Sequence, residues 1–265
     1  MYATSYHRAS SVEDAVKLRA AHEEGKYLSG GMTLISTMKQ RLAAPTDLID
    51  LRHIAALRGI SIDGREVTIG AATPHADVAG SRELRAICPA ICELASHIGD
   101  PHVRHMGTIG GSIANNDPAA DYPAGVLGLA ATVITDRRSI AADEFFTDLF
   151  ETALEDGEIV TAVSFDAPEK AGYAKFNNPA SRFAMVGVFV AKTSSGVRVA
   201  VTGAGSNGVF RHSGFEQALA SNWSADALSN IAVDSSNLLS DLHANAEYRA
   251  NLVKVMAKRA VVAAG

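Results

Sequence analysis

Two glycine pairs, each next to hydroxyl residues, are the segments with the clearest chemical potential. Residues 28–34 read LSGGMTL and residues 108–114 read TIGGSIA. Because glycine has no Cβ, its backbone can adopt positive φ and an anion can approach its N–H closely. Consecutive N–H groups in such a turn form a concave anion site, and a helix after the first pair would add its positive N-terminal end. Two such loops could hold the two phosphates of a dinucleotide from opposite sides, although a single glycine pair is more often an ordinary tight turn.

Two carboxylates follow the second glycine pair. Asp117 and Asp121 lie four positions apart in NDPAADYP. Paired carboxylates can serve acid–base chemistry or bind a cation, and a fixed carboxylate can accept hydrogen bonds from ribose or ribityl hydroxyls. One helix cap plus one solvent-facing acid is the simpler interpretation, and we favour it over catalysis.

The histidines and cysteines give weaker signals. His102 and His105 flank Arg104, but no third metal ligand accompanies them, so a zinc site is not predicted there. Cys88 and Cys92 share one face of a predicted helix. We interpret them as core residues in preference to a redox pair.

Two further features allow more than one interpretation. Residues 203–208, GAGSNG, match the dinucleotide pattern G-x-G-x-x-G. No helical pattern follows them, so a turn at the end of a strand is expected instead. Lys175 is either a solvated lysine or one that meets a phosphate or a flavin edge. No phosphate-loop or hydrolase-elbow motif occurs.

Composition excludes several classes of protein. The chain has 265 residues, is 47% hydrophobic and carries a net charge of −5, which favours a globular protein without a basic nucleic-acid surface. Its 2 cysteines cannot support a disulfide framework or ligate an iron–sulfur cluster. The N-terminus does not resemble a signal peptide, and no apolar stretch is long enough to span a membrane. We therefore expect a cytoplasmic protein.

Hydrophobic periodicity and turn residues predict an α+β fold that positions these loops. Strands are expected at 6–8, 26–28, 46–50, 60–62, 67–69, 159–165, 185–192 and 197–202. Helices are expected from residue 12, over 34–42, from residue 74, and over 84–97, 215–219, 225–233 and 246–263. Residues 99–121 are expected to be turn-rich. The composition changes near residue 177, which predicts a domain boundary there.

The two loops and their surroundings resemble the FAD-binding medium subunit of molybdenum hydroxylases of the carbon monoxide dehydrogenase and xanthine dehydrogenase type. Residues 29–33 (SGGMT) stand where that family has A-G-G-x-S, and residues 108–112 (TIGGS) stand where it has T-I-G-G-N. The resemblance continues at 103–107, 117–121, 157–161, 173–176, 178–182, 241–244 and 246–249.

The resemblance implies a PCMH-type FAD-binding domain over residues 1–176, with subdomains of about 1–56 and 57–176. A C-terminal domain with a small antiparallel sheet and helices would cover 177–265. It also implies a set of FAD-contacting residues: Tyr27, Leu28, Ser29, Gly30, Gly31, Met32, Thr33 and Leu34 at the pyrophosphate; Thr108, Ile109, Gly110, Gly111 and Ser112 as its second wall; Ala114, Asp117 and Asp121 at the ribityl and ribose hydroxyls; Ile159 and Val160 at the adenine; and Lys175 near the flavin ring.

The same resemblance implies an electron-transfer role with no catalytic residue in this chain. A large partner subunit would carry the molybdenum–pterin cofactor, and a small one would carry two [2Fe–2S] clusters. Electrons would reach FAD here and leave for an external acceptor, within a dimer of heterotrimers. Met32 and Ser112 depart from the family's usual polar residue and asparagine, which affects flavin contacts.

Two other functions stay open from the sequence. One is a degenerate nucleotide-binding or assembly module that has lost flavin. The other is a stand-alone flavin oxidase, which the missing substrate domain and the absence of a flavin-linking His or Cys disfavour.

Overall fold

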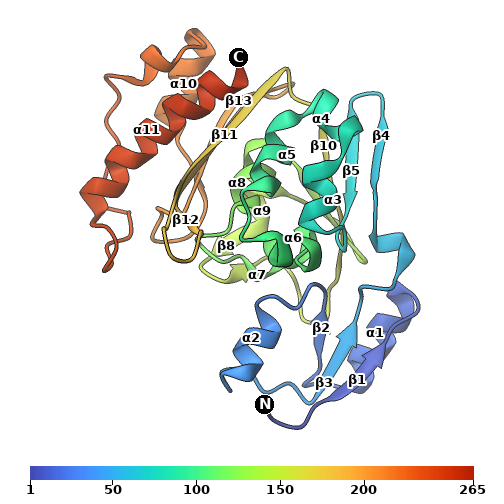
Figure 1. The fold of residues 1–265 in the computed structure, drawn as a ribbon. Coiled ribbons are helices and arrows are strands. Elements are labelled where there is room, and N and C mark those ends of the chain that lie inside the picture. Colours follow the sequence, from blue (N-terminus) through green and yellow to red (C-terminus); the bar gives the residue numbers. More distant parts are fainter.

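The computed structural model describes residues 1–265, and the chain forms three successive regions, each built on its own sheet (Figure 1). The N-terminal region has a parallel sheet in the order β1-β3-β2, with β3 in the centre. Its elements are β1 (Ser5–Arg8), α1 (Val12–Ala21), β2 (Lys26–Leu28), α2 (Leu34–Lys39) and β3 (Asp47–Asp50). The first glycine loop joins β2 to α2, as predicted.

The middle region contains an antiparallel sheet in the order β4-β5-β10-β6-β7. Its strands are β4 (Ile60–Asp63), β5 (Glu66–Gly70), β6 (Thr132–Thr135), β7 (Ser139–Ala141) and β10 (Val160–Asp166), and a short pair is formed by β8 (Phe146–Asp148) and β9 (Glu151–Thr152). Its helices are η1 (Ala55–Leu57), α3 (His75–Gly80), α4 (Arg82–Ile87), α5 (Pro89–Ser96), α6 (Pro101–Met106), α7 (Ile109–Asn115), α8 (Tyr122–Gly128) and α9 (Ala142–Phe145).

The C-terminal region is a four-stranded antiparallel sheet with helices on one face. Its elements are β11 (Lys170–Asn177), β12 (Ala184–Thr193), β13 (Gly196–Thr202), β14 (Phe210–Arg211), α10 (Ser213–Ser221), η2 (Ala225–Leu228) and α11 (Ala246–Ala264). The expected strands at 185–192 and 197–202 and the long last helix are confirmed.

Both faces of the C-terminal sheet are buried. Alternate residues of a strand point to opposite faces. Phe189 and Ala191 of β12 therefore join the core of the middle region, whereas Val188 and Val190 pack in the core under α11. In Figure 1 these yellow and orange strands lie between the green helices and the red helix α11. The sheet thus ties the C-terminal helices firmly to the middle region.

Three predicted elements were wrong. The expected helix over 84–97 is two helices, because Pro89 cannot donate a helical hydrogen bond and Cys88 before it leaves the helical conformation, at φ −145° and ψ 73°. The expected turn-rich stretch contains α6 and α7, which Asp100 and Thr108 cap with their side chains. The expected helix over 225–233 is only the short 3₁₀ helix η2.

One strand was missed at the predicted domain boundary. β11 begins at Lys170 and pairs with β12 along its length, so the C-terminal sheet includes residues ahead of position 177. The division into 1–176 and 177–265 stays a prediction. None of the helices has both the length and the apolar character needed to cross a membrane.

Candidate cofactor-binding site

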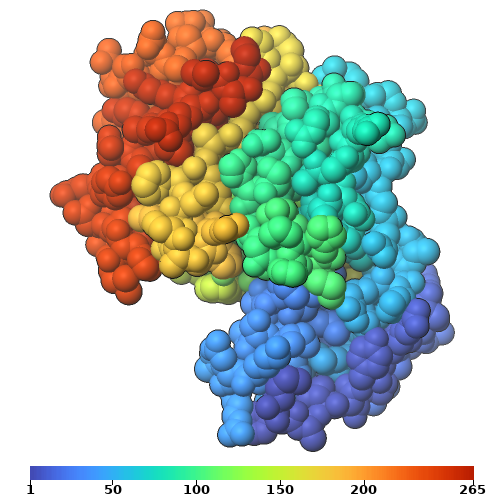
Figure 2. Space-filling model, in the orientation of Figure 1, coloured from blue at the N-terminus to red at the C-terminus, as the bar shows by residue number.

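A cavity of about 890 Å³ lies where the N-terminal region meets the middle region. This volume is in the range of about 300–1,000 Å³ that is typical of small-molecule and cofactor sites. Its walls come from the β2–α2 loop, from α6 and α7, from the segment between β9 and β10, and from residues 180–183. In the space-filling view, the blue N-terminal region projects from the green middle region, which it contacts along one side (Figure 2).

The structure brings together nearly all of the residues that the sequence predicted for the site. Every one of them lines this cavity except Ile109 and Lys175. Ile109 is buried in the core of the middle region, and the Lys175 side chain is fully enclosed by protein. Whether the lining residues contact FAD stays a prediction.

The first glycine loop presents a run of free N–H groups. The backbone N–H groups of residues 29–33 donate to no acceptor within the chain. The chain turns at Gly31, whose φ is +72°, a conformation that glycine adopts without strain. Consecutive unpaired N–H groups at a cavity wall are suited to an anion, since each can donate to a phosphate oxygen.

The second glycine loop is built differently. The N–H groups of Ile109, Gly110 and Gly111 donate to Thr73 O, Ala71 O and Thr108 Oγ1 at 3.3, 2.9 and 3.1 Å. They are therefore already paired within the protein. The second loop lines the cavity with glycines that have no side chains, whereas the unpaired backbone N–H groups belong to the first loop.

The two loops are joined to each other. Ser29 Oγ and Thr108 Oγ1 form a hydrogen bond of 2.8 Å. A Cβ on Gly30 would lie 2.2 Å from Met106 O, so only glycine allows the first loop to pack against the backbone that leads into the second. A Cβ on Gly110 would lie 2.5 Å from the Ala71 Cβ. These two glycines are required by packing between segments.

The two predicted carboxylates have different surroundings. Asp121 is buried, and its two oxygens accept hydrogen bonds from the Tyr173 hydroxyl and from Lys175 Nζ, the latter at 2.9 Å. Burial raises the pKa of Asp121, and Lys175 and Tyr173 oppose that shift. Asp117 Oδ1 accepts from the Ala119 N–H at 2.9 Å, while its Oδ2 has no partner in the chain. Asp117 therefore has the freer carboxylate oxygen at the cavity.

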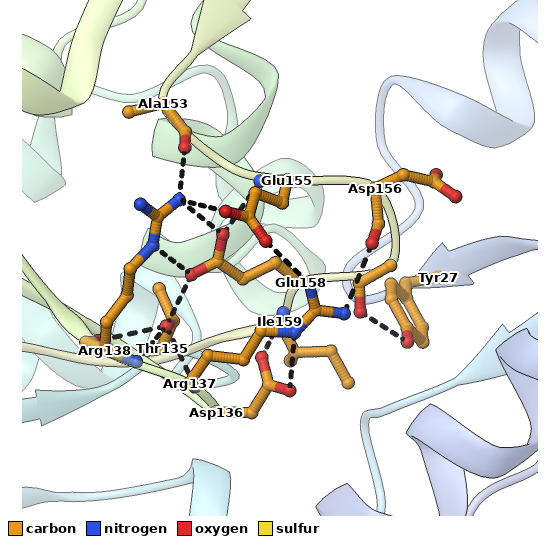
Figure 3. Close-up of polar contacts among 11 residues, drawn as sticks. Tyr27, Thr135, Asp136, Arg137, Arg138, Ala153, Glu155, Asp156, Glu158 and Ile159 are labelled. Carbon is orange, nitrogen blue, oxygen red and sulfur yellow. Dashed lines mark hydrogen bonds and ion pairs between the residues drawn. The ribbon is translucent and has the colours of Figure 1, made fainter.

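A dense polar network holds the segment between β9 and β10 against the β6–β7 hairpin (Figure 3). The buried Glu158 carboxylate accepts from Thr135 Oγ1 at 2.7 Å, from Arg138 Nη2 at 2.9 Å and from the Glu155 N–H at 2.8 Å. The Arg138 guanidinium is the main reason that the pKa of Glu158 is lowered to about 2. The network fixes the cavity wall that carries Ile159 and Val160.

Two hydrogen bonds connect this wall to the N-terminal region. The Tyr27 hydroxyl donates to Gly157 O at 3.0 Å, and Arg19 Nη2 pairs with Asp156 Oδ1 at 2.7 Å. Burial raises the pKa of Tyr27 to about 12, so the phenol remains a donor. Both contacts cross the seam that contains the cavity.

Several cavity residues were missed. His75 lines the cavity, and burial lowers its pKa to about 4, so its imidazole is neutral at pH 7. Arg182 and Phe183 reach the cavity from the C-terminal region, and residues 98–100 reach it from before α6. Arg182 falls within a segment that carries the family resemblance, but the other residues have no local sequence signal, since only the tertiary fold brings them to the site.

The weaker sequence candidates lie outside the cavity. His102 and His105 are exposed, and His105 Nδ1 contacts Pro101 O at 2.7 Å. Cys88 and Cys92 are buried free thiols, as predicted, and burial raises the pKa of both. Residues 203–208 follow β13 without opening a helix, which confirms the predicted turn at the end of a strand.

Comparisons with known proteins agree with this geometry. Residues 2–168 match the family model of the FAD binding domain in molybdopterin dehydrogenase. The carbon monoxide dehydrogenase medium chain of Afipia carboxidovorans is 36% identical, and the alignment covers 97% of this chain and 94% of the relative. The nicotine 6-hydroxylase medium subunit of Paenarthrobacter nicotinovorans is 32% identical, with 99% and 98% covered.

A solved structure extends the likeness to the whole fold. Reconstituted carbon monoxide dehydrogenase from Oligotropha carboxidovorans superposes with a TM-score of 0.90 at 33% identity, covering 100% of this chain and 99% of the matched chain. The match includes the C-terminal region beyond residue 168. The chain belongs to the family of FAD-binding domains of molybdopterin dehydrogenases.

Proposed function

We propose that this chain is the FAD-carrying medium subunit of a molybdenum hydroxylase and transfers electrons through its flavin. The observation that carries the proposal is the run of unpaired N–H groups at residues 29–33, placed in the wall of a cavity of cofactor size. Bound FAD would supply a redox centre that accepts electrons and passes them on. The protein's part is to bind, orient and enclose the cofactor.

The cavity residues fit the parts of FAD. The first loop would donate its N–H groups to the pyrophosphate, and Gly111 would allow the phosphates to approach the second loop closely. Asp117 Oδ2 is the free acceptor for ribityl or ribose hydroxyls. Ile159 and Val160, at the wall fixed by Glu158, would pack on the adenine. Lys175 would act at the flavin end through Asp121, which it contacts at 2.9 Å.

The relatives' names indicate the setting of this subunit. These relatives are medium chains of hydroxylases and dehydrogenases, and one related structure is a Cu,Mo-containing carbon monoxide dehydrogenase. We infer a large molybdenum–pterin subunit and a small [2Fe–2S] subunit as partners, in a dimer of heterotrimers in the cytoplasm. Electrons would leave for an external acceptor. The substrate of the complex is determined by the large subunit.

Reconstitution with FAD tests the proposal. We expect the purified chain to bind one FAD per chain in a calorimetric titration and to show a flavin spectrum that dithionite bleaches. Failure to bind FAD would support a degenerate module instead. The variant Gly31→Val tests the first glycine loop. The positive φ at this position is costly for a β-branched residue, so we expect FAD binding to be at least about tenfold weaker than in the parent chain.

A further inference from the structure

A second group of chemically capable side chains lies in the N-terminal region, separate from the cavity. His7 of β1, His22 after α1 and Asp47 of β3 have ligand atoms that all lie within 4.8 Å of one another. His7 Nε2 lies 2.6 Å and His22 Nδ1 lies 3.4 Å from the same oxygen, Asp47 Oδ1. None of the three residues lines the cavity. Two imidazoles therefore converge on one carboxylate outside the set of residues that lines the cavity.

The spacing of these atoms is close to that of a metal coordination sphere. Zinc–nitrogen and zinc–oxygen bonds are about 2.0–2.2 Å, which places neighbouring tetrahedral ligands about 3.3 Å apart. The His22–Asp47 separation of 3.4 Å already meets this value. The His7–Asp47 contact of 2.6 Å must lengthen by about 0.7 Å as a metal ion replaces the hydrogen bond between the two atoms.

Rigid elements position the three ligands. Asp47 begins the central strand β3, which pairs with β1 on one side and β2 on the other. The His22 carbonyl accepts from the Gly25 N–H at 2.8 Å and from Arg19 Nη1 at 3.3 Å, which fixes the backbone of His22. The imidazole rings of His7 and His22 lie 4.5 Å apart, tilted by 32°. A ligand set built on strands and a capped helix end needs little reorganisation to bind an ion.

Accessibility and charge also favour a cation. The side chains of His7 and His22 are 26% and 32% exposed, so an ion can enter and keep a water ligand, whereas that of Asp47 is only 10% exposed. With neutral imidazoles the cluster carries one negative charge. The nearby Arg19 charge is paired with Asp156. Imidazole and carboxylate ligands suit zinc and its neighbours in the first transition row.

We propose that His7, His22 and Asp47 form a binding site for one divalent transition-metal ion of the Zn²⁺ type. The ion joins β1, the α1–β2 turn and β3, and β2 leads directly into the Ser29–Thr33 loop. None of the three ligand residues lines the cavity, and the ion stabilises the N-terminal region by linking these three segments. This inference does not depend on flavin binding.

Cobalt binding tests the site, because Co²⁺ held by nitrogen and oxygen ligands gives visible absorption. The untagged full-length chain, freed of metal by treatment with chelator, is titrated with Co²⁺ and then with Zn²⁺. We expect one Co²⁺ per chain, colour that Zn²⁺ removes, and a higher melting temperature in the presence of Zn²⁺. His7→Gln and His22→Gln are expected to weaken binding at least about tenfold, whereas the exposed His102→Gln binds as the parent does.

The outcomes separate a metal site from a hydrogen-bonded cluster. Absence of a saturable one-to-one Co²⁺ complex in the parent chain overturns the proposal, whatever the variants do. Equal weakening by His102→Gln overturns it as well, since that result indicates scattered binding to surface histidines. If His22→Gln is poorly folded by circular dichroism, Asp47→Asn provides the second test, and unchanged affinity in a folded variant contradicts the site.

Discussion

At the scale of single residues, the two glycine loops share a sequence pattern but present different chemistry. The N–H groups of the first loop are free, whereas those of the second donate to Ala71, Thr73 and Thr108. The glycines of the second loop are also unequal. Gly110 faces Ala71 across a packed contact, and Gly111 faces the cavity beside Ser29.

This difference predicts that substitution of one glycine mainly weakens FAD binding, whereas substitution of its neighbour mainly destabilises the fold. Gly111→Val places methyl groups in the cavity, so we expect FAD affinity to fall at least about tenfold. Its Cβ would lie 3.0 Å from Thr108 Oγ1, a milder contact than the one at Gly110, so we expect a smaller loss of stability there. Gly110→Val forces a clash with Ala71 and costs about 1–3 kcal/mol of folding free energy. Calorimetric FAD titration and urea denaturation of both variants measure the two effects. Equal loss of stability in both would show that Gly111 is also a packing position.

Asp117 gives a second residue-scale prediction. Its Oδ2 lacks a partner in the chain, so it is the carboxylate we expect to accept a cofactor hydroxyl. Asp117→Asn retains the shape but removes the charge, and a charged hydrogen bond is worth about 1.5–3 kcal/mol, or roughly tenfold or more in affinity. Fluorescence titration with FAD measures this change. FAD affinity equal to that of the parent would exclude Asp117 from the hydroxyl contacts.

At the scale of elements, the position of the segment between β9 and β10 depends on the hydrogen bonds of Glu158. Its pKa is lowered to about 2 in the folded protein, chiefly by Arg138, from an ordinary value near 4.5. A lowered folded-state pKa contributes stability above the unfolded-state value, and this contribution is lost as pH falls toward the folded-state value. The ionised Glu158 therefore stabilises the fold at pH 7 and loses this effect between about pH 5 and pH 2.

The variant Glu158→Gln tests this dependence. We expect it to be less stable than the parent at pH 7 by about 2–3 kcal/mol, with the difference shrinking progressively below pH 5. Urea denaturation of both proteins at pH 7, 4 and 3 gives the difference directly. A stability difference that stays constant over this range would mean that the Glu158 charge is not linked to folding.

Local patterns predicted the strands of the N-terminal sheet and the last helix, but not the strand β11 or the short helices α6 and α7. The first glycine loop was placed correctly between a strand and a helix, because both flanking patterns were clear. α6 and α7 were missed since α6 begins with a proline and α7 has two glycines in its first turn, features that also mark turns. Capping by Asp100 and Thr108 was the signal that could have identified them.

The surroundings of the site residues could not be predicted from local sequence. The predicted carboxylate Asp121 is enclosed by Tyr173 and Lys175, which lie more than fifty positions along the chain on β11. His75 reaches the cavity because α3 packs on α5 and α6, and Arg182 and Phe183 reach it because the C-terminal region packs against the middle region. Which of the two carboxylates keeps a free oxygen at the cavity therefore depends on the tertiary fold and not on the local sequence.

At the scale of the whole molecule, the cavity lies on the seam between two regions with separate cores. A ligand that contacts both regions stabilises their association. FAD at a hundredfold excess over its dissociation constant is expected to add about 2.7 kcal/mol to the unfolding free energy. Thermal denaturation with increasing FAD measures the effect, and a melting temperature that does not change with FAD would contradict binding at the seam.

The most direct test of the proposed role as an FAD-carrying medium subunit is an absorption spectrum of the protein purified from its native host, with its co-purifying chains resolved on a denaturing gel. We expect flavin bands together with an iron–sulfur contribution, one FAD for each copy of this chain, and two further chains, one large and one small. A colourless chain that purifies alone and takes up no FAD on reconstitution would contradict it.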